Sequence, residues 1–367
     1  MSDEARERML KHFVVTRLGL GIYSEQWFAK MIDLFEAVTL ASLVRQTSTE
    51  FIWLIVIDAD MPSEARDRIA SLLRPYPNYH LVPIDVTRLL RVRQGCFDWV
   101  WDHCQDFILE RGLLDDPCDY IITSVIDADD AWHQDVISTI NKFMSDRLPH
   151  ACVGEEKRGT WIRHTAGIAV TFPHGYKWFI TANALEPIEH PFQSMGVFIA
   201  ARSSSGISAC SSRHRAWRSY CDVLAFEISE IERDRPMWVY ARHDRTTQPW
   251  DASAVVPMDS SASDQLRQAF GIDLHKVQRW REKYYPGTKA DGFPPVHSGR
   301  SVASQYDRIF RIAALNRQIE AFKRRRGKLG ETRSGSDGSL DEIIAQSEAQ
   351  RASLIEMLRA SGRSADA

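Results

Sequence analysis

The chain has 367 residues, 44% of them hydrophobic, and a formal net charge of -3 at pH 7. That length and hydrophobic content are enough for one large catalytic domain with an appendage. The longest unbroken apolar run, Phe51 to Ile57, is far shorter than the ~20 residues that a membrane helix needs. The near-neutral charge gives no overall attraction to nucleic acid. The composition therefore argues against a bilayer-spanning chain and against a nucleic-acid partner.

The amino-terminal residues and the cysteines indicate a reducing compartment. The chain opens with acidic residues among arginines and lacks the apolar segment of a secretory signal. Its cysteines form no C-x-x-C pair, which fits reduced core thiols better than a disulfide framework or a zinc site. They are Cys96, Cys104, Cys118, Cys152, Cys210 and Cys221. We therefore expect a cytoplasmic protein.

The first half of the sequence alternates between predicted strands and helices. Apolar and β-branched runs predict strands at residues 12–19, 51–57, 79–86 and 119–126. Helical spacing of apolar residues predicts helices at residues 24–47, 63–76, 96–112 and 133–146. Ser24 and Ser63 are the expected caps of the first two helices. This alternation is typical of an α/β fold with a mainly parallel sheet flanked by helices.

The second half is less regular. Shorter strands are predicted at 167–173, 176–182 and 196–202, followed by a helix over 215–231, a strand over 235–244 and mostly helix after 261. The glycine- and serine-rich run at 330–339 has the composition of a flexible linker. We predict a catalytic domain over 1–260, with a nucleotide-binding half at 1–150 and an acceptor half at 151–260. A helical extension (261–330), a linker (331–339) and a carboxyl-terminal helix and tail (340–367) follow.

The pentapeptide Val-Ile-Asp-Ala-Asp occurs twice, at residues 56–60 and 125–129, each time at the end of a predicted strand. In open parallel sheets ligands bind outside the carboxyl ends of the strands, so both acidic corners lie on the functional edge. Carboxylates at positions i and i+2 can face one cation, and oxygen ligands suit Mg²⁺ or Mn²⁺ better than zinc. The alternative is a solvated loop whose acids cap the next helix.

Two phrases carry a family resemblance: TLASLVRQTSTEFIWLIVIDADMP (39–62) and TSVIDADDAWHQDVI (123–137). They resemble the bacterial rhamnosyltransferases, which are glycosyltransferases with the Rossmann-like GT-A fold, and the resemblance covers residues 12–251. It implies that Asp127 and Asp129, with Asp130 beside them, bind the metal ion and the donor diphosphate. It also implies that Asp58 contacts the nucleoside, whereas Asp60 can simply cap the following helix.

Three further residues are assigned through the resemblance. His243 is a candidate for completing the metal shell, although a structural histidine bonded to its own loop is nearly as plausible. Thr16 and Arg17 are expected beside the nucleotide, where Arg17 can pair with phosphate. The adjacent Gly-x-Gly at 19–21 is a weak dinucleotide-binding signal, because Ser24 stands where a third glycine is needed.

The resemblance implies a metal-dependent transfer of a sugar from a nucleoside-diphosphate sugar to a glycan or lipid-linked acceptor. With dTDP-rhamnose as donor, one inverting displacement is the simpler expectation. Candidates for the base that deprotonates the acceptor hydroxyl are Asp222, His214 and Glu227. Two alternatives remain: a nucleotidyltransferase or metal phosphoesterase using the same D-x-D site, and a non-catalytic saccharide-binding protein on a GT-A fold.

The carboxyl-terminal helices lie outside the resemblance. Leu315, Ile319 and Phe322 recur at helical spacing beside the basic run 323–326, a mixture that suits peripheral contact with an anionic membrane surface. The alternative is that the apolar stripe packs on the catalytic domain and the basic residues face solvent.

Overall fold

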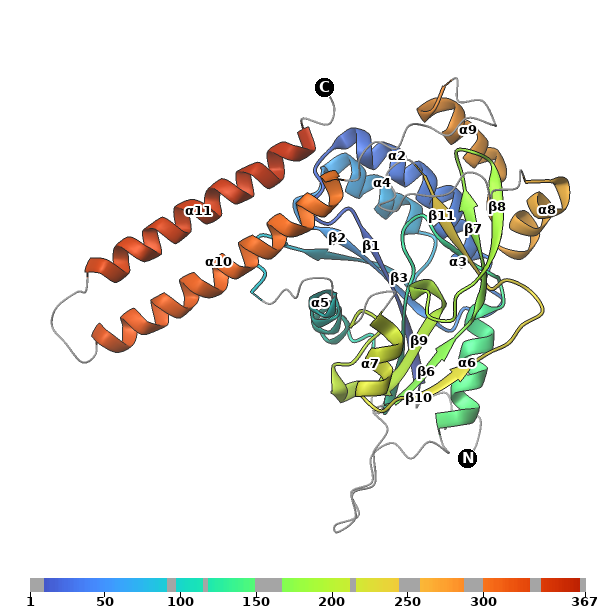
Figure 1. Cartoon of the computed structure of the whole chain (residues 1–367), viewed down its shortest axis with the longest axis horizontal. Helices are drawn as coiled ribbons and strands as arrows, with labels where there is room; N and C mark the ends of the chain where they lie inside the picture. The colour runs from blue at the N-terminus through green and yellow to red at the C-terminus, as the bar shows by residue number, and fades with distance from the viewer. Residues whose placement is uncertain are drawn as a thin grey trace, which may run out of the picture.

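A seven-stranded sheet forms the centre of the described part of the chain, in the order β10-β6-β9-β4-β1-β2-β3 (Figure 1). The computed structural model describes residues 10–90, 97–114, 118–148, 167–211, 216–243, 258–286, 300–330 and 338–363. The strands are β1 (Leu10–Leu18), β2 (Ile52–Asp58), β3 (Tyr79–Ile84), β4 (Tyr120–Val125), β6 (Gly167–Thr171), β9 (Val197–Arg202) and β10 (Glu227–Glu230). Strands β1 to β4 run parallel, and β9 runs antiparallel to β4 and β6. The expected α/β fold, with a mainly parallel sheet flanked by helices, is confirmed.

Alternate residues of the strands feed two apolar cores on opposite faces of this sheet. Val14 of β1 packs with α2 (Glu25–Phe35), α4 (Ser63–Leu73) and α6 (Val136–Arg147). Phe13 and Val15 pack with α5 (Asp98–Glu110), α7 (Trp217–Val223) and the carboxyl-terminal helices. A buried parallel sheet has to be apolar on both faces, which explains the continuous hydrophobic runs of β1 and β2.

The predicted helix at 24–47 is confirmed as three consecutive helical segments. Helix α2 is followed by a π-helical turn, η1 (Glu36–Leu40), and by α3 (Ala41–Val44). The Ser24 side chain caps α2 by accepting a hydrogen bond from the Trp27 N–H at 3.1 Å. The expected Ser63 cap is wrong, because Ser63 is the first residue inside α4 and Pro62 occupies the cap position.

A smaller sheet, in the order β5-β11-β7-β8, stands beside the carboxyl end of β4. Its strands are β5 (Ala131–Trp132), β7 (His174–Phe179), β8 (Ala184–Glu189) and β11 (Trp238–Arg242). Helices α8 (Ser260–Ala269) and α9 (Leu274–Tyr284) share an apolar core with this sheet. Two short helical turns, η3 (Ser194–Gly196) and η4 (Ser203–Ser205), flank β9.

Two sequence predictions in this half need correction. The helix predicted over 215–231 stops at Val223; a turn at Ala225 with positive φ follows, and β10 then pairs parallel with β6. The strand predicted over 176–182 is instead most of β7 and a turn through Asn183, also at positive φ, which leads into β8. In both places the pairing between strands determines the structure, and the local spacing of apolar residues does not reveal that pairing.

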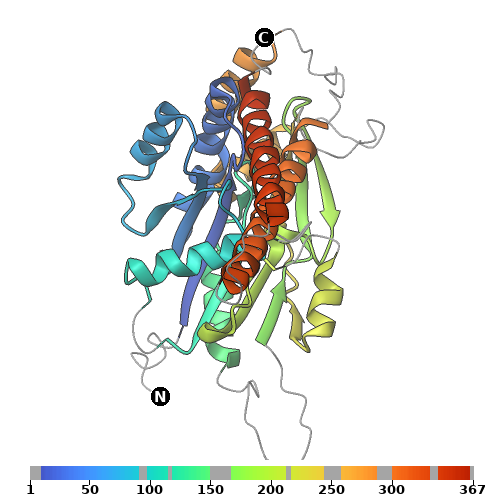
Figure 2. The same ribbon diagram turned by 90° about the vertical axis from the view of Figure 1, so that its left-hand side faces the viewer.

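Two long helices, α10 (Arg300–Gly330) and α11 (Gly338–Arg363), lie side by side in both views (Figures 1 and 2). Ile309 and Leu358 belong to the apolar core on one face of the main sheet. Leu315 and Ile319 of α10 are buried as well. The apolar stripe therefore packs inside the protein at Leu315 and Ile319, whereas Phe322 is half-buried. Lys323 and Arg326 of α10 form ion pairs of 2.8 Å with Glu348 and Asp341 of α11, respectively.

Three other expectations concern the cysteines, the linker and membrane-spanning helices. Cys104, Cys118, Cys210 and Cys221 are free and buried, as expected of reduced core thiols; Cys96 and Cys152 lie outside the described residues. Most of the predicted linker, residues 331–337, also lies outside them, and the division into domains stays a prediction. None of the helices in the described ranges is both long and apolar enough to cross a bilayer.

Candidate functional site

The second acidic corner is a tight turn that follows β4 directly. The Ile126 N–H donates to the Val15 carbonyl at 3.1 Å, which fixes the start of the turn to β1. The Asp130 N–H then donates to the Asp127 carbonyl at 3.2 Å and closes the turn. The side chains of Asp127 and Asp129 are 33% and 18% exposed. Two carboxylates thus face accessible space at the carboxyl end of a central strand.

Arg17, at the end of β1, is brought to Asp127 as the sequence suggested. Its Nη2 donates to Asp127 Oδ1 at 2.9 Å, and its guanidinium lies 3.6 Å from the centre of the Phe97 ring. Cation–π contact and the charge-assisted hydrogen bond both restrict the guanidinium. The result is a positive group fixed beside the carboxylates.

His243 follows β11 and meets Asp129. Its Nε2 lies 2.9 Å from Asp129 Oδ2, and its side chain is only 6% exposed. The edge of the imidazole packs against Trp280 of α9, with ring centroids 6.1 Å apart. The carboxylate and the imidazole are therefore held together by two different sheets.

Asp130 lies beneath the turn and not beside its two exposed carboxylates. It is fully buried, and its Oδ1 accepts the backbone N–H of Ala241 in β11 at 2.8 Å. Its Oδ2 has no hydrogen-bond partner among the described residues. Burial first, and then the charges of Asp129 and Asp127, raise the pKa of this carboxyl well above its usual range. Asp130 therefore joins the turn to β11, and its expected role as a metal ligand stays a prediction.

The donor set suits a hard divalent ion in its chemistry, since it offers two carboxylates and an imidazole. Across the described ranges, however, no group of three His, Cys, Asp or Glu side chains is arranged to hold a metal ion. Asp127 is bonded to Arg17 and Asp129 to His243. Each of these contacts uses one oxygen of its carboxylate, Oδ1 of Asp127 and Oδ2 of Asp129.

The first acidic corner has a different environment. Asp58 is 1% exposed, and its Oδ2 accepts the Gly21 N–H and the Tyr23 hydroxyl, both at 3.0 Å. Its Oδ1 accepts the Asp60 N–H at 3.0 Å. Burial is the largest cause that raises the pKa of Asp58, and these hydrogen bonds oppose it. These bonds join the end of β2 to the loop after β1, and the expected contact of Asp58 with the nucleoside stays a prediction.

Thr16 is also enclosed. It is fully buried; its hydroxyl donates to the Ile126 carbonyl at 2.8 Å and accepts the Trp53 indole N–H at 2.9 Å. These contacts tie β1 and β2 to the second corner, and the expected position of Thr16 beside the nucleotide stays a prediction.

The candidates for a catalytic base are scattered. Asp222 is exposed on α7 and lies 3.5 Å from Arg218, one turn earlier. Glu227 accepts a hydrogen bond of 2.6 Å from Arg147. Neither of these pairs includes a residue of the two acidic corners, and His214 lies outside the described residues.

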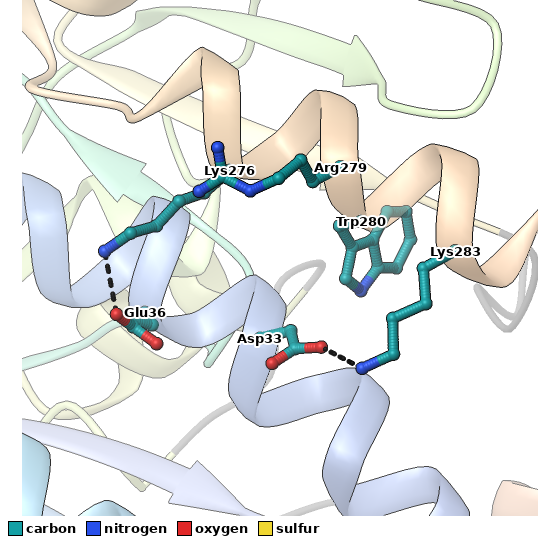
Figure 3. Close-up of a pocket in the computed structure, with 6 residues that line it drawn as sticks. All are labelled: Asp33, Glu36, Lys276, Arg279, Trp280 and Lys283. Carbon is teal, nitrogen blue, oxygen red and sulfur yellow. Dashed lines mark hydrogen bonds and ion pairs between the residues drawn. The ribbon is translucent and has the colours of Figure 1, made fainter.

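A pocket between α2 and α9 adjoins the His243 side of the site (Figure 3). Trp280 lines it, while Lys283 and Lys276 pair with Asp33 and Glu36 at 3.0 and 2.7 Å across it. The sequence did not predict that these residues line a pocket. Nor did it predict that Tyr23 contacts the first acidic corner or that Phe97 contacts Arg17 beside the second. The available signal was Tyr23, two residues after the Gly-x-Gly at 19–21; nothing around Trp280 forms a motif.

Comparisons with known proteins give one sequence-level match. A family model described as "Putative rhamnosyl transferase" matches residues 19–249. No curated protein sequence matches this chain significantly.

Several solved structures are similar in shape. The crystal structure of S. aureus TarS is 10% identical with a TM-score of 0.35; the match covers 96% of this chain but 55% of that one, so this chain spans about half its length. A "putative nucleotide-diphospho-sugar transferase" from Desulfovibrio desulfuricans G20 is 8% identical with a TM-score of 0.36, covering 75% of this chain and 99% of that one. TarS 1-349 in complex with UDP is 10% identical with a TM-score of 0.30, covering 97% and 92%.

Proposed function

Because this chain belongs to the rhamnosyl transferase family of glycosyltransferases, we propose that it transfers a sugar, with rhamnose as the first candidate, from a nucleoside-diphosphate donor to an acceptor hydroxyl. The observation that supports this most is the second acidic corner. Asp127 and Asp129 leave one turn at the carboxyl end of β4, partly exposed, with Arg17 and His243 bonded to them. In open α/β sheets this is the place where ligands bind.

Asp127 and Asp129 are the residues that would hold Mg²⁺ or Mn²⁺ in this proposal. The ion supplies positive charge that stabilises the departing nucleoside diphosphate. Support comes from the oxygen chemistry of the two side chains and from their exposure, which Asp58 and Asp130 lack. His243 is the third candidate, either as a ligand or as the group that orients Asp129.

Arg17 has a separate task in the proposal. Its guanidinium is bonded to Asp127, and Phe97 keeps it at the end of β1. A diphosphate at this edge offers oxygens for the same N–H groups, and arginine binds phosphate through paired, charge-assisted hydrogen bonds. Arg17 would then exchange a carboxylate partner for the donor.

The acceptor side is defined less closely. A glycan or lipid-linked hydroxyl is the proposed acceptor, and an inverting displacement is the simplest course for a dTDP-rhamnose donor. Of the two described candidates for the base, Asp222 is the more accessible. Glu227 forms a shorter ion pair, with Arg147, than Asp222 forms with Arg218, and less of the Glu227 side chain is exposed. A nucleotide-sugar donor is consistent with a reaction in the cytoplasm.

A donor screen followed by product analysis tests the function. The full chain would be incubated with UDP-, GDP- and dTDP-sugars and Mn²⁺ or Mg²⁺, with thermal stabilisation as the first readout, since a ligand that binds only the folded state raises its stability. Transfer is then followed by release of nucleoside diphosphate together with a glycosylated acceptor. A nucleotidyltransferase or phosphoesterase would release other products.

The variants Asp127→Asn and Asp129→Asn provide the site test. We expect each to lower turnover by at least about 100-fold, the usual scale for losing a group that stabilises developing charge. Asp135→Asn is the matched control: Asp135 lies five residues after Asp130 and bonds to Arg235 instead of joining the corner. Full activity in both corner variants would rule out this site.

A further inference from the structure

The α10–α11 hairpin closes over the carboxyl ends of β1, β2 and β3. At β1, the loop residue Gly21 touches both helices: a Cβ atom there would meet Ile309 Cδ1 at 2.8 Å and Leu358 Cδ1 at 3.6 Å. Gly21 also has φ of +72°, which strains any other residue. The loop after β1 is therefore shaped to accept the hairpin.

Polar contacts fix the hairpin at the next two strand ends. Arg359 of α11 forms an ion pair with Asp60, the last residue of the first pentapeptide. Asn316 of α10, which is 5% exposed, donates to the carbonyls of Thr87 and Leu89 after β3, at 2.9 and 3.0 Å. Three consecutive strand ends thus each contribute an anchor.

This docking explains why Asp58 is enclosed. The loop that donates Gly21 N–H and the Tyr23 hydroxyl to Asp58 is the loop covered by Ile309 and Leu358. With the hairpin in place Asp58 is 1% exposed. A ligand can reach the Asp58 carboxylate only if the loop and the hairpin separate.

The anchors differ in strength. The side chains of Arg359 and Asp60 are 48% and 45% exposed, and exposed ion pairs shift an equilibrium by about fivefold at most. The two hydrogen bonds of Asn316 are buried and cost more to break. The weakest contact is therefore at the end of α11, beside the first acidic corner.

We propose that the α10–α11 hairpin is a lid over the nucleoside part of the donor site, and that the Asp60–Arg359 pair is its latch. The proposal rests on the proposed function for the identity of the ligand. It also assigns different tasks to the repeated pentapeptide: the second copy faces the reacting diphosphate, and the first holds the lid. Removing the latch raises the open fraction, and the apparent dissociation constant of a ligand falls in proportion.

The test compares Arg359→Ala and Asp60→Asn with the parental full chain. We expect UDP or dTDP, titrated calorimetrically with Mn²⁺, to bind about twofold to fivefold more tightly to either variant. The exchanged pair Asp60→Arg with Arg359→Asp should return the affinity toward the parental value. Arg326→Ala is the matched control, since it removes an ion pair of the same hairpin, with Asp341, that does not involve the main domain.

A second readout needs no nucleotide. The Gly21 amide, which is bonded to Asp58, should exchange its hydrogen faster in Arg359→Ala but not in Arg326→Ala. Weaker nucleotide binding by Arg359→Ala would make Arg359 a ligand contact and overturn the lid, as would unchanged Gly21 exchange. If Gly21 exchange responds as expected but no nucleotide binds any variant, closure by the hairpin stands and the proposed function is what fails.

Discussion

Asp129 and His243 are 114 positions apart in the sequence, yet Oδ2 of the carboxylate lies 2.9 Å from Nε2 of the imidazole. Two features of the fold produce this contact. Strand β5, directly after the acidic turn, pairs antiparallel with β11, which ends one residue before His243. Asp130 then fixes the end of β11 through the Ala241 N–H. The buried carboxylate of Asp130 therefore helps to position the end of β11, and with it His243, beside Asp129.

Replacing Asp130 tests this role. Asp130→Ala leaves the Ala241 N–H without its acceptor, and we expect a loss of about 1 to 3 kcal/mol in the free energy of unfolding, the usual range for a stranded buried donor. Asp130→Asn keeps an acceptor oxygen of the same size and should restore most of that stability. Urea unfolding monitored by tryptophan fluorescence measures both. Equal losses in the two variants would mean that the charge, and not the Ala241 bond, is what matters.

The first corner gives a prediction that separates structure from binding. Asp58→Ala removes the acceptor of the Gly21 amide, the Tyr23 hydroxyl and the Asp60 amide, so we expect it to destabilise the fold by at least about 1 to 3 kcal/mol. Tyr23→Phe removes one of the three bonds and should cost less. A denaturant titration without nucleotide measures these losses and so tests the structural role of Asp58. Unchanged stability together with weaker nucleotide binding would instead restore Asp58 as a direct nucleoside contact.

Stability should fall in mild acid because of a buried histidine inside the main sheet. His12 Nδ1 lies 2.8 Å from Asn141 Oδ1 and its Nε2 lies 3.0 Å from Ser124 Oγ. Burial lowers the pKa of His12 from 6.5 to about 4, against the opposing effect of Asn141. The unfolded chain takes up a proton near pH 6.5 and the folded chain only near pH 4. Stability is thus fully present above pH 6.5 and is lost as the pH falls toward 4.

The size of this loss follows from the pKa difference. At about 1.4 kcal/mol per pKa unit, His12 accounts for roughly 3 kcal/mol between pH 6.5 and 4. His133, whose pKa burial also lowers to about 4, adds to the same window. Unfolding free energies at pH 7.5, 6, 5 and 4.5 measure the slope. We expect His12→Gln to be less stable than the parental chain at pH 7.5, and its free energy of unfolding to fall less steeply as the pH decreases. An unchanged slope would mean that His12 does not cause the loss of stability in acid.

The sequence was sufficient for the half of the fold whose signals are local. Strands β1 to β4 are buried on both faces, so their apolar runs are continuous and stand out. Asp127 and Asp129 could be placed at the functional edge because strand ends in such a sheet converge, whereas Arg17 and His243 were assigned through the family resemblance. Whether each of them has its assigned role stays a prediction.

The rest depended on contacts between distant segments. Thr16 and Asp58 are enclosed by Trp53, by Tyr23 and, through the Gly21 loop, by helices some 300 residues later. No local pattern distinguishes a strand-end aspartate that faces a ligand from one that accepts three protein hydrogen bonds. Strand β10 was missed for a similar reason, because pairing with β6 and not apolar spacing defines it.

The last prediction concerns membrane contact by the hairpin. Leu315 and Ile319 are buried, so the apolar stripe is not available for insertion into a bilayer. Arg324 and Arg325 are exposed on α10, whereas Lys323 and Arg326 already pair with α11. Each free arginine near an anionic surface contributes about 1 kcal/mol, and salt screens the attraction within a Debye length of about 8 Å at physiological ionic strength.

We therefore expect weak, salt-sensitive binding to anionic vesicles. The full chain should sediment with phosphatidylglycerol liposomes at low salt and remain in the supernatant at physiological salt. The double substitution Arg324→Ala with Arg325→Ala should abolish the low-salt binding, whereas Arg66→Ala, an exposed arginine on α4, should leave it unchanged. Binding that survives physiological salt would contradict a purely electrostatic contact, because it requires apolar residues to leave the core and enter the lipid.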